Sequence, residues 1–458
     1  MEEDWKKRIQ QYKTIWKAEA KQISIMKKVL EEKDDVGSVV TCFVIAPLLC
    51  AYVSWVVREA EKTGKKRLYF LARDGYYMKK VAEIFCKEWK LPIECRYLYG
   101  SRYIWRGAVY HQNTEEALDY ITLGGLEVNF NKVMQRAGLK EEVQTIANRL
   151  GYDKESKQRF SAEERKILRK KLSECELFLQ LLNKYSKEKY EKTVEYLVQE
   201  GLTDNIHYAL VDSGWTGSLQ KSLTKILKNM GYEKVLEGYY FGMYHRPIQK
   251  EVGLYHTYYF SPEKNIKRKV FFNNNVFECV YSAPHGMTIG YEQKEMGKWL
   301  PVLEQKENPN KERLEKVEPL LLAYAKEYAN SYKKNWKCEQ KIEKECLEKV
   351  VYLFMSRPTK EEVEEYGTYV FCDDVIGEEK QVLAPNLSKQ QLKQGFLLAK
   401  LKKRWWKSKR MEKGSAWLEG SVCLVMGERG FWHCVLCEYI RFLVETFKNK
   451  RQDRKKNE

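Results

Sequence analysis

Proline and glycine are scarce in this chain, with 10 and 26 residues among 458. A collagen-like repeat or a flexible low-complexity scaffold needs far more of both, so these classes are excluded. Hydrophobic residues make up 43% of the chain and aromatic residues 13%, which excludes a disordered protein. At roughly 100–200 residues per domain, the chain has enough material for a folded protein of more than one unit.

The cysteines lack the spacing of a zinc site. Cys434 and Cys437 form a close pair, but no second close pair accompanies them. Most of the 12 cysteines stand singly in apolar stretches, as Cys42 and Cys50 do, which is typical of reduced thiols in a cytosolic protein. The first residues, MEEDWKKRIQQYK, favour a charged helix rather than a signal peptide. We therefore expect a cytoplasmic protein.

Negative charge is in deficit, because 82 Lys and Arg face 64 Asp and Glu, a formal net charge of +18. Most basic residues alternate with acids, as on solvated helix faces, so a nucleic-acid partner is not favoured. The exception is 402–410, where six of nine residues are Lys or Arg around Trp405 and Trp406. This segment predicts peripheral contact with an anionic membrane, while a solvated basic helix is the alternative.

Residues 37–57 contain no charge and are long enough to span a bilayer. Pro47, however, suits the first turn of a helix that continues into charged residues up to Glu61. We favour a buried core helix over a membrane span.

Strand and helix patterns alternate in the first two thirds of the chain. Buried strands are expected at 68–72, 93–100, 206–212 and 236–244, with helices between them. Residues of about 104–205 have helical periodicity throughout. The pattern predicts an α/β fold with a Rossmann-like parallel sheet, interrupted by a helical cap.

This pattern divides the chain into an N-terminal helix at 1–36, an α/β core at 37–300 and a mostly helical region at 301–458. In that last region helices are expected at roughly 309–335 and 340–356. Thr359 and Glu362 have the spacing of a capping box and predict a further helix after Pro358.

Polar residues follow three of the expected strands: Arg73-Asp74-Gly75, Ser101-Arg102 and Asp212-Ser213-Gly214. In a parallel sheet these strand ends meet at one edge, where ligands bind. We expect the two acids to hold Mg²⁺ and the two arginines to balance charge, with Ser101 contacting phosphate.

The segment after the third of these strands, Asp212-Ser213-Gly214-Trp215-Thr216-Gly217-Ser218, is expected to be a loop that opens a helix. Backbone N–H groups at a helix start bind anions, and Gly214 and Gly217 allow close approach of a ligand. Trp215 has two interpretations, stacking on a sugar or base and packing in the core.

Three of these motifs together, FLARDGYYM, YLYGSR and LVDSGWTGSLQ, resemble a bacterial family described as predicted hydrolases of the haloacid dehalogenase (HAD) superfamily, found with cell-surface polysaccharide biosynthesis genes. FECVYSAPHGMTIGY (277–291) and SRPTKEEVEEYG (356–367) extend the resemblance to about residues 40–375. It implies a HAD-like hydrolase acting on a phosphorylated sugar or related intermediate. It also implies that Asp74 lies in the first motif, Ser101 in the second and Asp212 in the metal-binding acid motif.

The chain departs from the superfamily pattern at one position. That pattern has two acids two residues apart, a nucleophile and a general acid, whereas this chain has only Asp74, with Ala72 before it and Tyr76 after it. One half of the expected pair is therefore missing from the motif.

Two other functions stay open. Residues 211–218 are also similar to the phosphate loop of type I phosphoribosyltransferases, although Val211 stands where an acid is usual. The second alternative is a non-catalytic phosphate-binding scaffold for glycosyltransferases at the membrane. His285, seven residues after Glu278, has two interpretations as well, lining the pocket and being satisfied within a turn.

Overall fold

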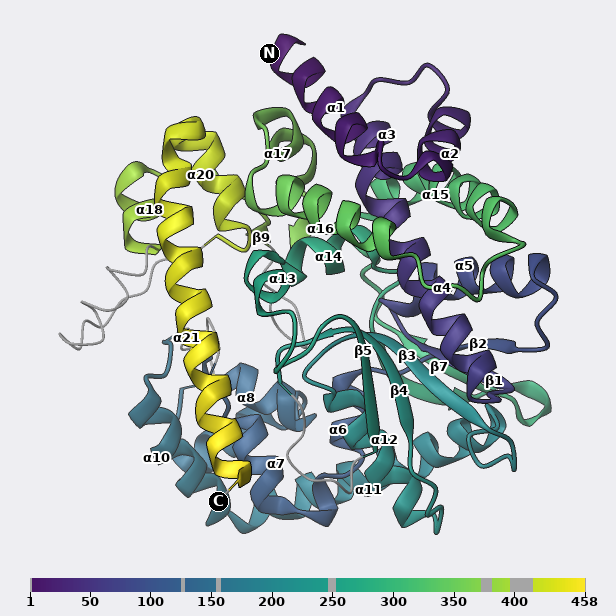
Figure 1. Cartoon of the computed structure of the whole chain (residues 1–458). Helices are drawn as coiled ribbons and strands as arrows, with labels where there is room; N and C mark the ends of the chain where they lie inside the picture. The colour runs from purple at the N-terminus through teal and green to yellow at the C-terminus, as the bar shows by residue number, and fades with distance from the viewer. Residues whose placement is uncertain are drawn as a thin grey trace.

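The computed structural model describes residues 2–124, 128–153, 158–245, 253–371, 381–395 and 415–457. Within these ranges a parallel β-sheet is surrounded by helices, so the expected α/β class is confirmed (Figure 1). The basic segment 402–410, expected to contact membranes, lies outside the described residues.

The sheet has five parallel strands in the order β2-β1-β3-β4-β5. They are β1 (Arg67–Leu71), β2 (Glu94–Leu98), β3 (Tyr208–Trp215), β4 (Glu237–Met243) and β5 (Leu254–Phe260). The four expected strands are all present, but β3 continues three residues further than expected. The sequence patterns did not predict β5.

The central strands are mostly apolar and buried because both faces of the sheet are covered. All five residues of β1 are buried. Phe70 of β1 lies opposite Tyr97 of β2 and Val211 of β3, so the carboxyl ends of these three strands are neighbours. This register places the candidate site.

A long helical insertion connects β2 to β3, as expected. It contains α6 (Arg102–Gly107), η2 (Tyr110–Gln112), α7 (Thr114–Ile121), α8 (Phe130–Ala137), α9 (Val143–Leu150), α10 (Ala162–Ser173) and α11 (Glu176–Gln199). Most of these helices share a hydrophobic cluster of their own, which includes Phe130, Ile146 and Phe178. α6 and the end of α11 pack instead on the sheet, with α12 (Ser218–Asn229).

The opposite face of the sheet is covered by α4 (Ala46–Lys62) and by α5 (Gly75–Glu88), which joins β1 to β2. α4 continues α3 (Val36–Val40) and the π-helix η1 (Thr41–Ile45), and its first turn contains Pro47. The combined helix is long and apolar enough to cross a membrane, yet 83% of its most apolar window is buried within the fold. The core-helix interpretation accounts for it.

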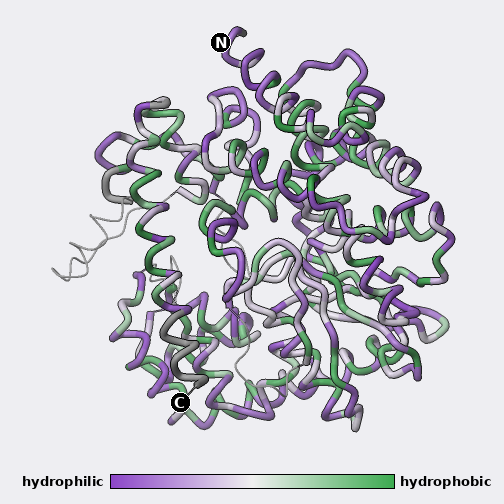
Figure 2. Tube along the Cα trace, viewed as in Figure 1, coloured by the Kyte–Doolittle hydropathy of each residue, from purple (hydrophilic) through white to green (hydrophobic). Residues whose placement is uncertain are grey.

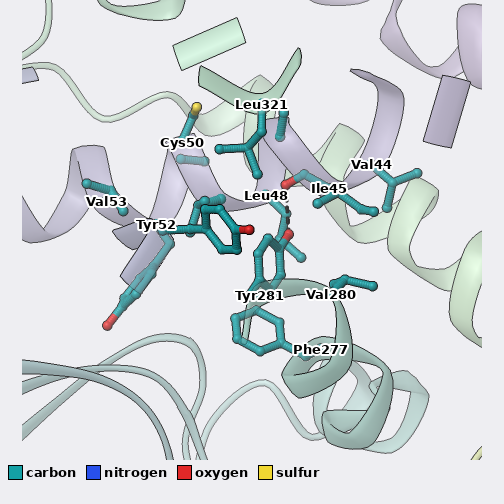
Figure 3. Close-up of a cluster of buried hydrophobic side chains, with 14 of the residues drawn as sticks. Val44, Ile45, Leu48, Cys50, Tyr52, Val53, Phe277, Val280, Tyr281 and Leu321 are labelled. Atoms are coloured by element: carbon teal, nitrogen blue, oxygen red, sulfur yellow. Dashed lines mark hydrogen bonds between the residues drawn. The ribbon is translucent and has the colours of Figure 1, made fainter. Parts of the chain in front are cut away.

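Figure 3 shows how α4 is held in this core, with Tyr52 and Leu48 beside Tyr281 and Phe277. Tyr281 Oη donates a hydrogen bond to the carbonyl of Ile45 at 2.7 Å. Tyr52 Oη lies 2.9 Å from the carbonyl oxygen of Asp212 and 2.8 Å from that of Tyr239. Tyr52 thus anchors the end of β3, where the site lies.

Helices from both ends of the chain complete this side. They are α1 (Glu2–Trp16), α2 (Ala20–Leu30), α13 (Ile266–Phe271), α14 (Asn274–Tyr281), α15 (Lys311–Tyr332), α16 (Lys341–Ser356), α17 (Lys360–Tyr366), α18 (Lys389–Gly395), α20 (Leu418–Met426) and α21 (Phe431–Asn457). One hydrophobic cluster contains Trp5, Phe70, Tyr324 and Trp417, so it joins the N-terminal, central and C-terminal segments.

The expected helices of the C-terminal region are confirmed by α15 and α16. The Thr359 hydroxyl accepts from the Glu362 backbone while the Glu362 carboxylate accepts from the Thr359 backbone, so the capping box of α17 is also confirmed. The remaining short elements are β6 (Thr288–Gln293), η4 (Glu295–Gly297), β7 (Trp299–Leu303), β8 (Val370–Phe371), β9 (Gln381–Val382) and η5 (Gly427–Gly430).

Candidate functional site

The structure brings the ends of β1 and β3 into direct contact. The Ser213 hydroxyl, on β3, donates a hydrogen bond to the Asp74 carboxylate, which follows β1. Arg102 begins α6 after β2, and its positive charge reaches both Asp74 and Asp212. The sequence-based expectation that these three strand ends converge is confirmed.

The backbone at the end of β1 has an unusual conformation. Arg73 has a φ of +73°, which is costly for a residue with a Cβ atom. Its N–H donates to Tyr97 Oη at 2.8 Å and its carbonyl accepts from Ala283 N at 3.1 Å. A Cβ atom on Gly75 would lie 2.8 Å from the Phe70 carbonyl carbon, so only glycine lets α5 start this close to β1. Together these contacts fix the position of Asp74.

Asp74 and Asp212 form a carboxylate pair of raised pKa. Burial raises the pKa of Asp74, opposed by the hydrogen bond from Ser213 and by the charges of Arg73 and Arg102. Burial also raises the pKa of Asp212, and the nearby charge of Asp74 adds to the shift. The repulsion between two carboxylates shows that their charges are only partly balanced by the protein.

Glu278 of α14 is a third carboxylate in this group. Burial, followed by the charge of Asp74, raises the pKa of Glu278, while Arg102 and Arg73 oppose the shift. The Glu278 carboxylate accepts a hydrogen bond of 2.6 Å from Trp215 Nε1. The sequence analysis did not place Glu278 in the site, because it lies 66 residues beyond Asp212 on a helix of another part of the fold.

The prediction of a loop at 213–218 is wrong for most of these residues. Ser213, Gly214 and Trp215 belong to β3, where Gly214 lies opposite Gly242 of β4. A Cβ atom on Gly214 would approach the Gly242 carbonyl oxygen to 2.4 Å, so the glycine is required by the neighbouring strand. Only Thr216 and Gly217 connect β3 to α12.

Trp215 packs in the core, the second of its two interpretations. Its ring stacks on Phe260 at 6.3 Å between centroids and contacts Phe272 and Phe277. Its remaining polar group, Nε1, is used by Glu278. Trp215 is therefore half-buried against the core, where it positions a carboxylate.

Ser101 also has a structural role. Its buried hydroxyl accepts from Ile104 N at 3.1 Å, which caps α6, and donates to the Thr288 carbonyl at 2.7 Å. The neighbouring Arg102 is exposed, and so is Arg73. The exposed Arg73 and Arg102 are thus better placed to contact a phosphate than Ser101, whose hydroxyl is already used.

A hydrogen-bonded Tyr97–His285 pair forms one wall of the site. His285 Nδ1 lies 2.8 Å from the Gly286 carbonyl, and Nε2 lies 2.8 Å from Tyr97 Oη. Because Tyr97 Oη accepts from Arg73 N, its own proton goes to His285 Nε2, which fixes a neutral imidazole. Burial lowers the pKa of His285, and the charge of Arg73 lowers it further. His285 is thus satisfied within its turn, the second of its two interpretations, and its role in lining a ligand pocket stays a prediction.

A cavity of about 300 Å³ lies between the helical insertion and α12. Ser218 lines it at the first turn of α12, followed by Lys221 and Lys225 on the same face, with Arg106 and Tyr120 from the insertion. Glu116 of α7 binds both lysines across the cavity, with 2.9 Å to Lys221. The N-cap of α12 is Gly217, which has no side chain to cap the helix. Among the described residues of the expected loop, Ser218 alone lines this cavity.

The donor set fits a divalent cation held by two carboxylates. Asp74 and Asp212 repel each other, and within the described ranges neither accepts an ion pair from a lysine or arginine at contact distance. Mg²⁺ binds through one or two carboxylates and keeps water or phosphate oxygens as its other ligands. A cluster of three or more His, Cys, Asp or Glu ligands is absent from the described residues, so an all-protein metal cage is not present there.

Comparisons with known proteins found no matching family model and no matching curated protein.

Proposed function

We propose that this protein is a HAD-like hydrolase that releases phosphate from a phosphorylated sugar or a related intermediate of surface-polysaccharide synthesis. The observation that carries the proposal is the group of three carboxyl groups, Asp74, Asp212 and Glu278, which face Arg73 and Arg102 at the carboxyl edge of a parallel sheet. Raised pKa values with specific charged partners in this position are typical of catalytic sites.

The residues divide into distinct roles. Asp74 and Asp212 would hold Mg²⁺, which supplies charge neutralisation at the phosphoryl group. Arg73 and Arg102 bind phosphate oxygens, since guanidinium groups match them in charge and geometry. Asp74 is also the carboxylate that attacks phosphorus, with the bond to the sugar oxygen breaking as the new P–O bond forms.

Glu278 provides the proton donor that the sequence motif lacks. The departing sugar oxygen requires a proton, and neither Ala72 nor Tyr76 carries a carboxyl group there. The raised pKa of Glu278 keeps a proton available near neutral pH. Water then hydrolyses the phosphoryl-aspartate, and the deprotonated Glu278 accepts the proton of that water.

The cavity beside Ser218 would take the part of the substrate that does not react. It combines apolar and aromatic walls with Arg106 and with the ion-paired Lys221, Lys225 and Glu116, which suits the ring and hydroxyl groups of a sugar.

The test is Mg²⁺-dependent phosphate release from a panel of sugar phosphates. Wild type is compared with Asp74→Asn, Asp212→Asn and Glu278→Gln, and with Glu343→Gln as a matched control. Glu343 is also a buried carboxyl group of raised pKa, but it lies between α2, α15 and α16. Turnover by wild type and Glu343→Gln, with loss in the three site variants, supports the proposal. Equal background release by all five proteins contradicts it and favours the transferase or scaffold alternatives.

A further inference from the structure

The last helix, α21, turns polar side chains toward the protein. Glu438 accepts two hydrogen bonds from Arg357, at 2.7 and 2.6 Å. About two turns further on, Glu445 accepts from Lys269 of α13 at 2.5 Å. Cys434 and Cys437 are buried on the same side, against α20. Glu438 and Glu445 therefore both hold this helix to the rest of the protein.

The opposite side of α21 is apolar and exposed. Its exposed hydrophobic residues are Trp432, Val435, Leu436, Tyr439, Phe442, Val444 and Phe447. Trp432 is 79% exposed, Tyr439 59% and Phe447 67%. Figure 1 shows the helix on the outside of the molecule, running from α20 toward the helical insertion, and Figure 2 shows hydrophobic segments along it. A stripe of large apolar side chains in water is costly, so it marks an interaction surface.

The charge around this stripe is positive. Arg441 is exposed, as is Lys448, which also pairs with Glu445 at 2.8 Å, and the helix sequence continues with Lys450, Arg451, Arg454, Lys455 and Lys456. The only acid of α21 besides the two that face inward is Asp453. An apolar stripe with Trp and Tyr, bordered by cations, is complementary to a bilayer surface with anionic headgroups.

We propose that α21 docks this protein flat on an anionic membrane surface, with Trp432, Tyr439 and Phe447 inserted at the level of the headgroups. Lys269, the partner of Glu445, also donates to the carbonyl of Tyr244 at the end of β4. α21 therefore lies on the side of the sheet where the strands end, and docking brings that edge near the bilayer. The inference does not depend on the reaction at the candidate site.

The test uses the full chain and co-sedimentation with two kinds of vesicle, pure phosphatidylcholine and phosphatidylcholine with about one third phosphatidylglycerol. The stripe variant combines Trp432→Ser, Tyr439→Ser and Phe447→Ser. Its matched control combines Ile167→Ser, Val235→Ser and Met296→Ser, three exposed apolar residues in other elements. A third variant replaces the Lys and Arg residues of 402–410 with Ser.

We expect wild type and the control to bind the anionic vesicles, more weakly as salt rises, and the stripe variant to lose about tenfold or more in partitioning. Equal binding to both vesicle types, or unchanged binding by the stripe variant, overturns the proposal. Loss of binding only in the 402–410 variant overturns it as well. A wild-type dimer in size-exclusion chromatography that the stripe variant converts to monomer identifies a second copy as the occupant and also overturns it.

Discussion

Two groups of buried carboxyl groups in this protein differ in what satisfies them. Glu343 lies in the helical part, where Gln22 Nε2 donates to one oxygen at 2.5 Å and Tyr328 Oη to the other at 3.1 Å. Burial raises the pKa of Glu343 to about 8. Its hydrogen-bonding capacity is thus met by neutral donors from α2 and α15, as expected of a structural polar contact.

The carboxylates at the end of the sheet have different donors, and Asp212 accepts from the backbone N–H groups of Ser213 and Gly214. Asp74 accepts a hydrogen bond from the Ser213 hydroxyl, and Glu278 accepts one from the Trp215 indole N–H. Their positive neighbours, Arg73 and Arg102, are exposed and act on them by charge rather than by close ion pairs. Burial and a raised pKa alone therefore do not identify a functional site. Glu343 also has a like charge, Glu19, and a cation, Arg58, within electrostatic reach. The distinguishing feature of the other group is that three carboxyl groups gather at the carboxyl edge of a parallel sheet.

The largest effect that would separate the two groups is on activity. Asp212→Asn or Asp74→Asn should lower the rate of phosphate release by roughly 10²–10⁴-fold, since each removes a charge that the reaction needs. Glu343→Gln should keep the wild-type rate within about twofold, because its contacts serve packing alone. Steady-state kinetics with the best sugar phosphate measures the rates of all these variants. A matching loss of rate in Glu343→Gln would contradict the distinction between the two groups.

The pH dependence of stability tests the structural group. Because the pKa of Glu343 is raised to about 8, the folded protein retains a proton that the unfolded chain releases above about pH 4.5. Its contribution to stability is therefore greatest below pH 4.5 and falls as the pH rises toward 8.

Glu343→Gln should remove this loss, so its free energy of unfolding declines less than that of wild type between pH 5 and 8, by roughly 1–3 kcal/mol. Denaturant unfolding at the two pH values measures it. Parallel pH profiles for wild type and variant would show that Glu343 is already ionised in the folded protein.

Metal binding tests the site carboxylates without any substrate. Mg²⁺ at about 100 times its dissociation constant should stabilise wild type and Glu343→Gln by about 2.7 kcal/mol, through binding to the folded state alone. Asp74→Asn and Asp212→Asn should lose most of that gain. Thermal unfolding with and without Mg²⁺ measures the difference, and equal stabilisation of all four proteins would locate the cation elsewhere.

The smallest expected effect concerns the link between Trp215 and Glu278. Trp215→Phe keeps an aromatic ring among Phe260, Phe272 and Phe277 but removes the indole N–H, at a cost of about 1 kcal/mol in stability. Without that donor the pKa of Glu278 should rise further, since the hydrogen bond favours the charged form. The alkaline limb of the pH–rate profile should then move to higher pH. An unchanged profile would assign Trp215 to packing alone.

Much of the fold follows from local patterns. The apolar run of β1, the helical periodicity of 104–205 and the capping box at Thr359 are properties of adjacent residues, and the structure confirms each of them. β5 (Leu-Tyr-His-Thr-Tyr-Tyr-Phe) was missed because it contains a single aliphatic residue, and its burial depends on its neighbours α4 and β4.

The candidate site divides in the same way. The convergence of Asp74, Arg102 and Asp212 at one edge could be predicted from the sequence, because parallel strands joined by helices end on the same side. The tertiary structure is needed to show that Trp215 packs against the core, that Ser101 caps α6, and that Glu278 and Tyr97 join the site. The physical reason is that these roles depend on contacts between segments far apart in the chain, and no local pattern of residues encodes which distant side chain will be there.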